Sequence, residues 1–579
     1  MARLRTLALA SAAVLITSTL VAGPAIQASS KPSPPAPAAR VLIVLFDQML
    51  PQYADQFAMP NFRTVRDGGR SYAKAYLGYM ASETVIAHNV ITSGLEPKHM
   101  GYTDEAYRDS RNLFLKGTDA MHITGDLSLT DFANVETNNG VPYPKLADYL
   151  HTARPGSSFI TVGEKSYAVE SATGATGDIA VRLSSRRTVL DAKGDPKPGF
   201  CTNLAIPGAP TALNYREPVG RAVPSYLTAS CGRFFVNSDK SNDYGTKAAF
   251  PSFMYPSEGN RFWPGNDRAH LGGDTWVADA AIEMMAHETN WSGMFVTMGA
   301  IDKAGHMWGA QADTAAQDCT TLAGMTHVRC AAENADVQLG KLLAAVKQVD
   351  KLRGGKTLVV LTADHGATYG HSFHGKPDKD AGDSNWYYAP SNLGVFDAGA
   401  GAGAPDTVAY SNPSPAVQHL DADHNLQFSY QSTALESWLI DHTTPKKKQG
   451  AQRMLEMPGV TASYWRDGDH FVLHGTNAMT NSERQWWRAH GQEIVDTMAA
   501  ADGPDVVGLE HDRTSYGVYG DHGGAQESVQ RVPMVFSMPG IEAESTGQKF
   551  RTLDLMPTVL RAMGISATAP TDGQAHSLR

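Results

Sequence analysis

The stretch TLVVLTADHG, residues 357–366, is an apolar run that ends in a short polar turn. Its apolar residues follow one another without alternating with polar ones, which is typical of a strand buried on both faces of a sheet. When such strands are parallel, the residues that follow them meet at one edge, where α/β sheets present groups to a ligand. We therefore expect an α/β fold with Asp364 and His365 at that edge.

Other short apolar runs also lie next to polar or glycine-rich turns. Apolar residues with helical spacing lie between these runs, at residues 278–287 and 331–349. This alternation of strands and helices predicts a mostly parallel central sheet with helices on both faces. Residues 41–46 lead to Asp47, residues 159–162 lead to Lys165, residues 294–298 lead to Asp302, and residues 534–536 follow the turn that contains His522.

The composition is that of a globular protein, with 42% hydrophobic and 19% charged residues. The length of 579 residues is more than one compact core usually needs. The net charge of −10 argues against stable binding to nucleic acid or to an anionic membrane, although a local basic pocket is compatible with it.

Residues 1–28 have the composition of a secretory signal peptide. A basic start is followed by an apolar stretch at residues 7–21 and by two small residues, Ala25 and Ala28, near a plausible cleavage site. The alternative is an uncleaved membrane anchor, but Ser and Thr interrupt the stretch and a Gly-Pro pair ends it. We expect export and cleavage, and hence a secreted or extracytoplasmic protein without a membrane span.

A Pro/Ala-rich linker is expected at residues 29–40, ahead of a main domain at residues 41–575. Two segments interrupt the strand–helix alternation of that domain. Residues 186–265 are rich in Pro, Gly, Asn and Ser, and residues 375–500 contain a Gly/Ala-rich tract and a run of lysines. We expect both segments to be smaller inserted subdomains.

The four cysteines predict disulfide bonds, because their number is even and the chain is expected to be exported. Among the three possible connectivities we favour the pairs that are close in sequence, Cys201 with Cys231 and Cys319 with Cys330. None of the four has the spacing of a zinc ribbon, so we expect no metal role for them.

Thr84 opens a predicted helix at residues 85–91. A hydroxyl at the start of a helix lies near free backbone N–H groups and the positive end of the helix dipole, where anions bind. Ser and Thr are also ordinary helix caps, so the position of Thr84 alone does not identify a function.

Aspartate and histidine residues gather after the predicted strands. Asp302 and His306 are four residues apart, so both can face one cation from a helical turn or a tight loop. Asp364 and His365 are adjacent, and from a loop they can reach two neighbouring metals. Three aspartates, three histidines and a hydroxyl are about what two adjacent divalent cations need. These candidate ligands are Asp47, Thr84, Asp302, His306, Asp364, His365 and His522.

The ordered set resembles the alkaline phosphatase superfamily, in its type I phosphodiesterase/nucleotide pyrophosphatase branch. The resemblance spans roughly residues 41–570 outside the two insertions, and the order of the motifs makes it specific. It includes the tail from Arg551, which is similar to the closing helix of these enzymes. The matching positions are Asp47; Thr84, His88, Gly94, Pro97 and Gly101; Asp302, Gly305 and His306; Asp364, His365 and Gly366; and His522.

The resemblance implies that residues 41–575 form an alkaline-phosphatase-like catalytic domain with two divalent cations. The mixed histidine and carboxylate ligands favour Zn²⁺, which Mn²⁺ or Fe could replace. Thr84 would attack phosphorus in line and form a phospho-threonine, which water would then hydrolyse. One cation would be bound by Asp302, His306 and His522, and the other by Asp47, Thr84, Asp364 and His365.

Two positions depart from the family pattern. The family commonly has an Asn eleven residues after Gly94, where this chain has Glu105, and a carboxylate there would repel phosphate unless protonated or paired. Either the loop is shifted or the phosphoryl oxygens are bound elsewhere. Lys165 resembles a lysine of the secreted phosphomonoesterases of this superfamily, but their partner arginine is Tyr167 here. Lys165 could neutralise a phosphoryl oxygen or be a solvated loop lysine.

The predicted function is that of a secreted two-metal hydrolase of phosphodiester or nucleotide pyrophosphate bonds, acting on a small phosphate ester or a nucleotide. An alkaline phosphomonoesterase is the alternative, which Lys165 favours, and a non-catalytic secreted metal-binding protein is an alternative of another class. Sulfate ester hydrolysis is disfavoured because no cysteine has the C/S-x-P-x-R context. The His- and Asp-rich residues 371–383 could hold a further cation, but their composition is more typical of a solvated loop.

Overall fold

The structure, a computed structural model, covers most of the predicted main domain. The predicted signal peptide, residues 371–383 and three of the four cysteines lie outside the described residues, so the disulfide pairings stay predictions. Within the described part, no helix is long and apolar enough to cross a membrane. The described residues are 37–113, 117–123, 143–163, 165–174, 176–183, 213–215, 226, 271–302, 305, 328–368, 415–512, 514–516 and 520–578.

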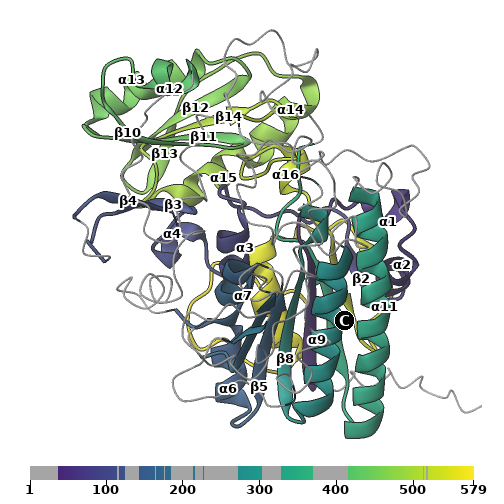
Figure 1. Ribbon diagram of the computed structural model, residues 1–579. Coiled ribbons are helices and arrows are strands. Elements are labelled where there is room, and N and C mark those ends of the chain that lie inside the picture. Colours follow the sequence, from purple (N-terminus) through teal and green to yellow (C-terminus); the bar gives the residue numbers. More distant parts are fainter. Residues whose placement is uncertain are drawn as a thin grey trace, which may run out of the picture. The chain divides into compact units, whose positions relative to one another are not determined.

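The larger of the two main sheets in the described part of the chain has nine strands (Figure 1). Its central strands β9, β1, β8, β5 and β6 are all parallel, whereas β15 and β7 run antiparallel to their neighbours. The predicted mostly parallel sheet is therefore confirmed. In order across the sheet, the strands are β16 (Glu544–Thr546), β2 (Arg70–Tyr72), β15 (Met534–Ser537), β9 (Thr357–Thr362), β1 (Arg40–Phe46), β8 (Trp291–Met298), β5 (Ser158–Gly163), β6 (Ile179–Leu183) and β7 (Leu213–Tyr215).

The central strand β1 shows why the apolar runs are continuous. Consecutive residues such as Ile43 and Val44 pack into two different hydrophobic clusters, and both are fully buried. Each such burial is worth about 1.5–3 kcal/mol relative to exposure. Helices cover both faces, as predicted. The cluster of Val44 includes α2 (Pro60–Asp67), α9 (Leu271–His287) and α11 (Val328–Arg353), and the cluster of Ile43 includes α6 (Leu146–Ala153) and α17 (Leu555–Ala562).

A second, five-stranded sheet is antiparallel throughout. Helix α13 (Thr444–Leu455) packs on it, and a hydrophobic cluster of its own lies between them. The sheet continues beyond residue 500, the boundary that we predicted for this insertion. In order across the sheet, the strands are β10 (Leu426–Gln431), β11 (Ala434–Leu439), β14 (Val506–Glu510), β12 (Val460–Asp467) and β13 (His470–Thr476).

The other described elements are shorter. The strands β3 (Ala106–Asp109) and β4 (Ala120–Ile123) pair with each other in a small antiparallel sheet. The other elements are α1 (Tyr53–Gln56), α3 (Thr84–Ser93), α4 (Pro97–Met100), α7 (Ser166–Thr173), α12 (Pro415–Leu420), α14 (Asn481–Trp486), η7 (Trp487–Gly491), α15 (Gln492–Val495), η8 (Asp496–Met498), α16 (Glu527–Gln530) and η9 (Thr552–Asp554).

A buried ion pair joins β3 to the five-stranded sheet. Arg108 donates from Nη2 to Oδ2 of Asp505 at 2.8 Å, and the two side chains are 3% and 0% exposed. Arg466 contacts the other oxygen of Asp505 at 3.0 Å, and the backbone N–H of Leu439 also donates to Oδ2. Two guanidinium groups therefore compensate the buried carboxylate, which holds β3, β11 and β12 together.

Replacing Asp505 by Ala should destabilise the fold, because Arg108 then stays buried without its carboxylate. Breaking a buried pair in this way typically costs about 3–5 kcal/mol. Urea denaturation measures the free energy of unfolding. The matched control is Asp469→Ala, whose side chain is 100% exposed and should change stability by less than about 0.5 kcal/mol. Equal unfolding free energies for the two variants would contradict the role of Asp505.

Candidate active site

The carboxyl ends of three neighbouring strands bring the predicted aspartates together. Asp47 directly follows β1, Asp364 follows β9, and Asp302 lies four residues after the end of β8. The N–H of Asp47 donates to the carbonyl of Met298 at 2.9 Å, which continues the β1–β8 pairing into the site. Because the order of these strands is β9-β1-β8, residues more than 250 positions apart in sequence meet at one edge.

One group of candidate ligands consists of Asp47, Asp364 and His365, all of which are fully buried. His365 Nε2 lies 3.4 Å from Asp47 Oδ1 and 3.6 Å from Asp364 Oδ2, and none of these three atoms has a hydrogen-bond partner. Two ligand atoms bound to one tetrahedral Zn²⁺ at about 2.0–2.1 Å lie about 3.3 Å apart. Buried polar atoms that converge without partners at this spacing fit a metal ion.

The second group consists of Asp302, His365 and His522, whose candidate ligand atoms lie within 4.8 Å of one another. His522 Nε2 is 3.7 Å from Asp302 Oδ1, and the rings of His365 and His522 stack with centroids 3.6 Å apart. His306, the third predicted ligand of this group, lies outside the described residues. His365 belongs to both groups, so the two candidate metal positions are adjacent.

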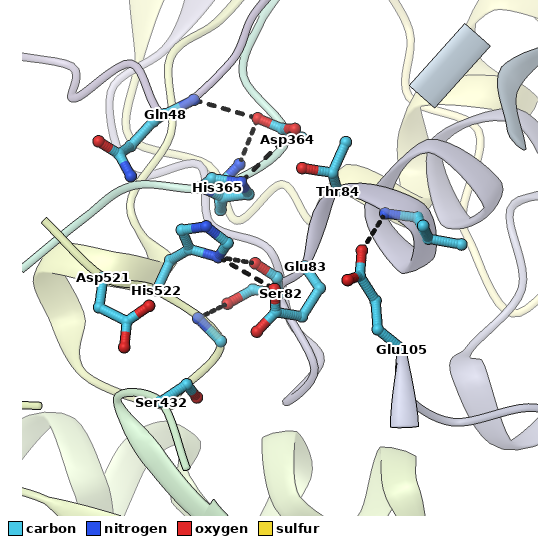
Figure 2. Close-up of polar contacts among 12 residues, drawn as sticks. Gln48, Ser82, Glu83, Thr84, Glu105, Asp364, His365, Ser432, Asp521 and His522 are labelled. Carbon is cyan, nitrogen blue, oxygen red and sulfur yellow. Dashed lines mark hydrogen bonds and ion pairs between the residues drawn. The ribbon is translucent and has the colours of Figure 1, made fainter. Parts of the chain in front are cut away.

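A backbone carbonyl contacts Nδ1 of each histidine, and Figure 2 shows His522 beside Ser82. His365 Nδ1 lies 3.0 Å from the carbonyl of Gly366, and His522 Nδ1 lies 3.1 Å from that of Ser82. A carbonyl can only accept, so in each ring Nδ1 carries the hydrogen and Nε2 keeps its lone pair for the site. Metal-binding histidines are typically held by such second hydrogen bonds.

Gln48 supports both groups, although the sequence analysis did not identify it. Its backbone N–H donates to Asp364 Oδ1 at 3.2 Å, and its side-chain amide donates to Asp302 Oδ1 at 3.2 Å. Its φ of 63° places it in the left-handed region, which non-glycine residues rarely adopt. A Cβ on Gly305 would meet Gln48 Oε1 at 1.8 Å, so the glycine at position 305 makes room for this amide.

Thr84 is the first residue of α3 and is 3% exposed. Glu83 holds the N-cap position, so Thr84 is not the cap of this helix. The hydroxyl Oγ1 of Thr84 accepts a hydrogen bond from Lys165 Nζ at 3.3 Å. In the view of Figure 2, Thr84 lies between the Asp364–His365 pair and Glu105.

Lys165 occupies the centre of the site instead of the solvent. Its Nζ lies 2.7 Å from Asp47 Oδ2 and 2.6 Å from Asp302 Oδ2, and its side chain is 9% exposed. Burial alone would lower the pKa of Lys165, but the carboxylates of Asp302 and Asp47 raise it well above its usual value. The interpretation of Lys165 as a solvated loop lysine is therefore excluded.

The buried carboxylates carry more negative charge than Lys165 can compensate. Burial, followed by the charges of Asp302 and Asp364, raises the pKa of Asp47 well above its usual value. Burial also raises the pKa of Asp364 to about 7. Carboxyl groups in this situation gain from divalent cations, which offset both the burial and the mutual repulsion.

Glu105 lies at the amino end of α3, next to Thr84. Its Oε1 accepts a hydrogen bond from the backbone N–H of Val85 at 3.1 Å, and the residue is partly exposed. The loop therefore does bring Glu105 to the amino end of α3. Its carboxylate accepts the hydrogen bond of the N–H group of Val85, the residue that directly follows Thr84. Glu83 and Asp521 also lie near His522 and escaped the sequence analysis, because nothing in their local sequence distinguishes them (Figure 2).

No family model matches the chain, and no curated protein matches it. Solved structures do match. Alkaline phosphatase PafA is 14% identical with a TM-score of 0.59, over 93% of this chain and 98% of that chain. Murine ectonucleotide pyrophosphatase/phosphodiesterase 5 (12% identity, TM-score 0.46) and phosphonoacetate hydrolase from Sinorhizobium meliloti 1021 (13%, 0.46) each match over 92% of this chain and 97% of theirs. The likeness to PafA confirms the predicted alkaline-phosphatase-like fold.

Replacing Asp364 by Asn should remove bound metal without disturbing the fold. The asparagine keeps Oδ1, which accepts from the N–H groups of Gln48 and His365, but it replaces the unpartnered Oδ2 with an amide nitrogen that does not bind cations. Elemental analysis of purified protein should show less metal than in the wild type, and Asp469→Asn is the surface control. Full metal content in Asp364→Asn would remove Asp364 from the ligand set.

Proposed function

We propose that this chain is an exported phosphoric-ester hydrolase that uses two divalent cations, most suitably Zn²⁺, to cleave phosphodiester or nucleotide pyrophosphate bonds. The observation that carries the proposal is the position of Thr84. Its hydroxyl lies beside Lys165, which in turn contacts an aspartate of each candidate metal group. A hydroxyl in this position is a nucleophile that bound cations and a nearby ammonium can activate. Export rests on the predicted signal peptide at residues 1–28.

The donor set matches two adjacent cation positions. Divalent cations bound there would lower the pKa of the Thr84 hydroxyl and offset the charge of the phosphoryl oxygens. The mixture of imidazole nitrogens and carboxylate oxygens favours zinc over the harder cations Mg²⁺ and Ca²⁺. One position would use Asp302, His306 and His522, and the other would use Asp47, Thr84, Asp364 and His365.

The reaction proceeds in two halves on Thr84. Oγ1 attacks phosphorus, so that an oxygen–phosphorus bond forms while the bond to the leaving oxygen breaks with its electron pair. The hydroxyl proton leaves Thr84, and the leaving oxygen takes up a proton. A water oxygen then displaces Oγ1, which regains a proton, and a diester substrate is released as an alcohol and a phosphate monoester.

Neighbouring residues hold Thr84 ready for this attack. His88 Nδ1 lies 2.7 Å from the carbonyl oxygen of Thr84, and its Nε2 lies 2.9 Å from Thr297 Oγ1 at the end of β8. Burial lowers the pKa of His88 to about 3, so the ring stays neutral and acts as a fixed brace rather than as an acid. The first turn of α3 is thereby tied to the sheet, which limits the movement of the nucleophile.

An alkaline phosphomonoesterase is the second candidate, and the position of Lys165 favours it, because an ammonium beside Thr84 adds positive charge for a doubly charged monoester. A non-catalytic metal-binding protein would be expected to have lost part of its ligand set or its nucleophile. Among the predicted ligands, the described residues retain Asp47, Thr84, Asp302, Asp364, His365 and His522, which supports the enzyme.

Thr84→Ala should abolish turnover and keep the bound metal, because it removes only the hydroxyl that attacks phosphorus. We expect a loss of at least about a thousandfold in kcat. Turnover of an aryl phosphate ester and elemental analysis are measured on the same preparation. Thr64→Ala, which removes an exposed hydroxyl on α2, should leave both values unchanged. Substantial activity in Thr84→Ala would exclude Thr84 as the nucleophile.

The choice between diester and monoester is tested with a bis-aryl and a mono-aryl phosphate. The metal-loaded wild type should turn over the bis-aryl ester with the higher kcat/KM, and a chelator should abolish this activity. A strong preference for the mono-aryl ester would replace the diesterase proposal with the phosphomonoesterase. Absence of any turnover with both cations bound would favour the binding protein.

A further inference from the structure

Glu105 is a charged group at the place where a substrate anion would sit. Its carboxylate takes the N–H of Val85, which an anion at the amino end of α3 would otherwise use. Val85 directly follows Thr84, so the substrate phosphorus must come close to this carboxylate when Oγ1 attacks. Glu105 therefore removes one hydrogen-bond donor from the phosphoryl group and adds one negative charge beside it.

Another acidic side chain, Glu83, directly precedes Thr84 in the chain. Glu83 is buried, and its Oε2 lies 3.5 Å from His522 Nδ1. Lys165 Nζ contacts the hydroxyl of Thr84 and the carboxylates of Asp47 and Asp302. A substrate at Thr84 therefore meets both a positive and a negative side chain.

The charge of the substrate distinguishes two classes of phosphate ester. A phosphodiester carries one negative charge at neutral pH, whereas a monoester carries nearly two because its second pKa is about 6. A carboxylate beside the reacting phosphorus repels the doubly charged monoester about twice as strongly as the singly charged diester. Glu105 therefore disfavours the monoester.

We propose that Glu105 is the specificity-determining residue of this site, and that it selects singly charged phosphodiesters over doubly charged phosphomonoesters. The inference rests on the proposed function and deepens it. It also explains how the site can contain Lys165 without becoming a phosphomonoesterase, because the carboxylate of Glu105 offsets the added positive charge. Repulsion over a few ångströms at a partly solvated position corresponds to a discrimination of about 10- to 100-fold.

The test compares Glu105→Gln with Glu456→Gln. Glutamine keeps an oxygen for the N–H of Val85 and removes only the charge. Glu456 is half exposed at the end of α13, so Glu456→Gln serves as the control for the change in net charge. The kcat/KM for the mono-aryl phosphate, relative to that for the bis-aryl phosphate, should rise about tenfold or more in Glu105→Gln. It should stay at the wild-type ratio in Glu456→Gln.

A binding measurement provides a readout that does not depend on turnover. Calorimetry of inorganic phosphate, a dianion above about pH 7, is performed on the metal-loaded Thr84→Ala protein with and without Glu105→Gln. The added substitution should tighten phosphate binding about tenfold or more. Metal content and thermal unfolding are measured on every variant, and Glu105→Asn replaces Glu105→Gln if the latter does not fold.

Three results would overturn the role of Glu105. One is that Glu105→Gln changes neither the ratio of kcat/KM for the two esters nor the affinity for phosphate. Another is that Glu105→Gln lowers kcat/KM for the mono-aryl phosphate relative to the bis-aryl phosphate, which would mean that the carboxylate favours dianions. The third is loss of a cation in Glu105→Gln, which would make Glu105 a metal ligand. Turnover of both esters at an unchanged ratio, with an unchanged phosphate affinity, rejects only this inference. A lack of turnover in all metal-loaded proteins rejects the proposed function, while the phosphate titration still decides the role of Glu105.

Discussion

The structure of this site depends on the burial of three carboxylates at one edge of a parallel sheet. Asp47, Asp302 and Asp364 are 0–2% exposed. Burial and the charges of Asp302 and Asp364 raise the pKa of Asp47, so nearby positive charge stabilises its ionised form. Lys165 supplies one such charge by contacting Asp47 and Asp302. Burying several carboxylates destabilises a folded protein unless cations compensate their charge. The cost indicates that the site is built for a ligand, since stability alone would favour apolar residues there.

The sheet makes this concentration of charge possible because its strands are rigid and their ends are close together. Backbone and amide groups then refine the positions, as Gln48 does for Asp364 and Asp302. The five-stranded sheet contributes from the other side. The turn between β10 and β11 reaches the His522 loop, where the N–H of Thr433 donates to the carbonyl of His522 at 3.3 Å. The second sheet therefore helps to position His522, a member of one of the two candidate metal groups.

Lys165 and Glu105 both contact the first turn of α3. The fold places the Thr84 hydroxyl at the start of this helix, near two candidate metal groups, and this arrangement is compatible with several ester classes. Lys165 brings positive charge to the Thr84 hydroxyl, and Glu105 brings negative charge to the N–H of the next residue, Val85. The difference between these two contributions, rather than the metal ligands, is what we infer to decide the substrate class.

The sequence by itself determined the layered α/β fold and the candidate ligands, because continuous apolar runs specify buried strands and the residues after parallel strands must meet at one edge. Asp47, Asp364 and His365 could be named in this way without coordinates. The tertiary structure alone decided where Lys165 and Glu105 lie, and that Gln48 contacts both candidate metal groups. These positions depend on loop paths and on distances between residues far apart in the chain, which no local pattern of residues encodes.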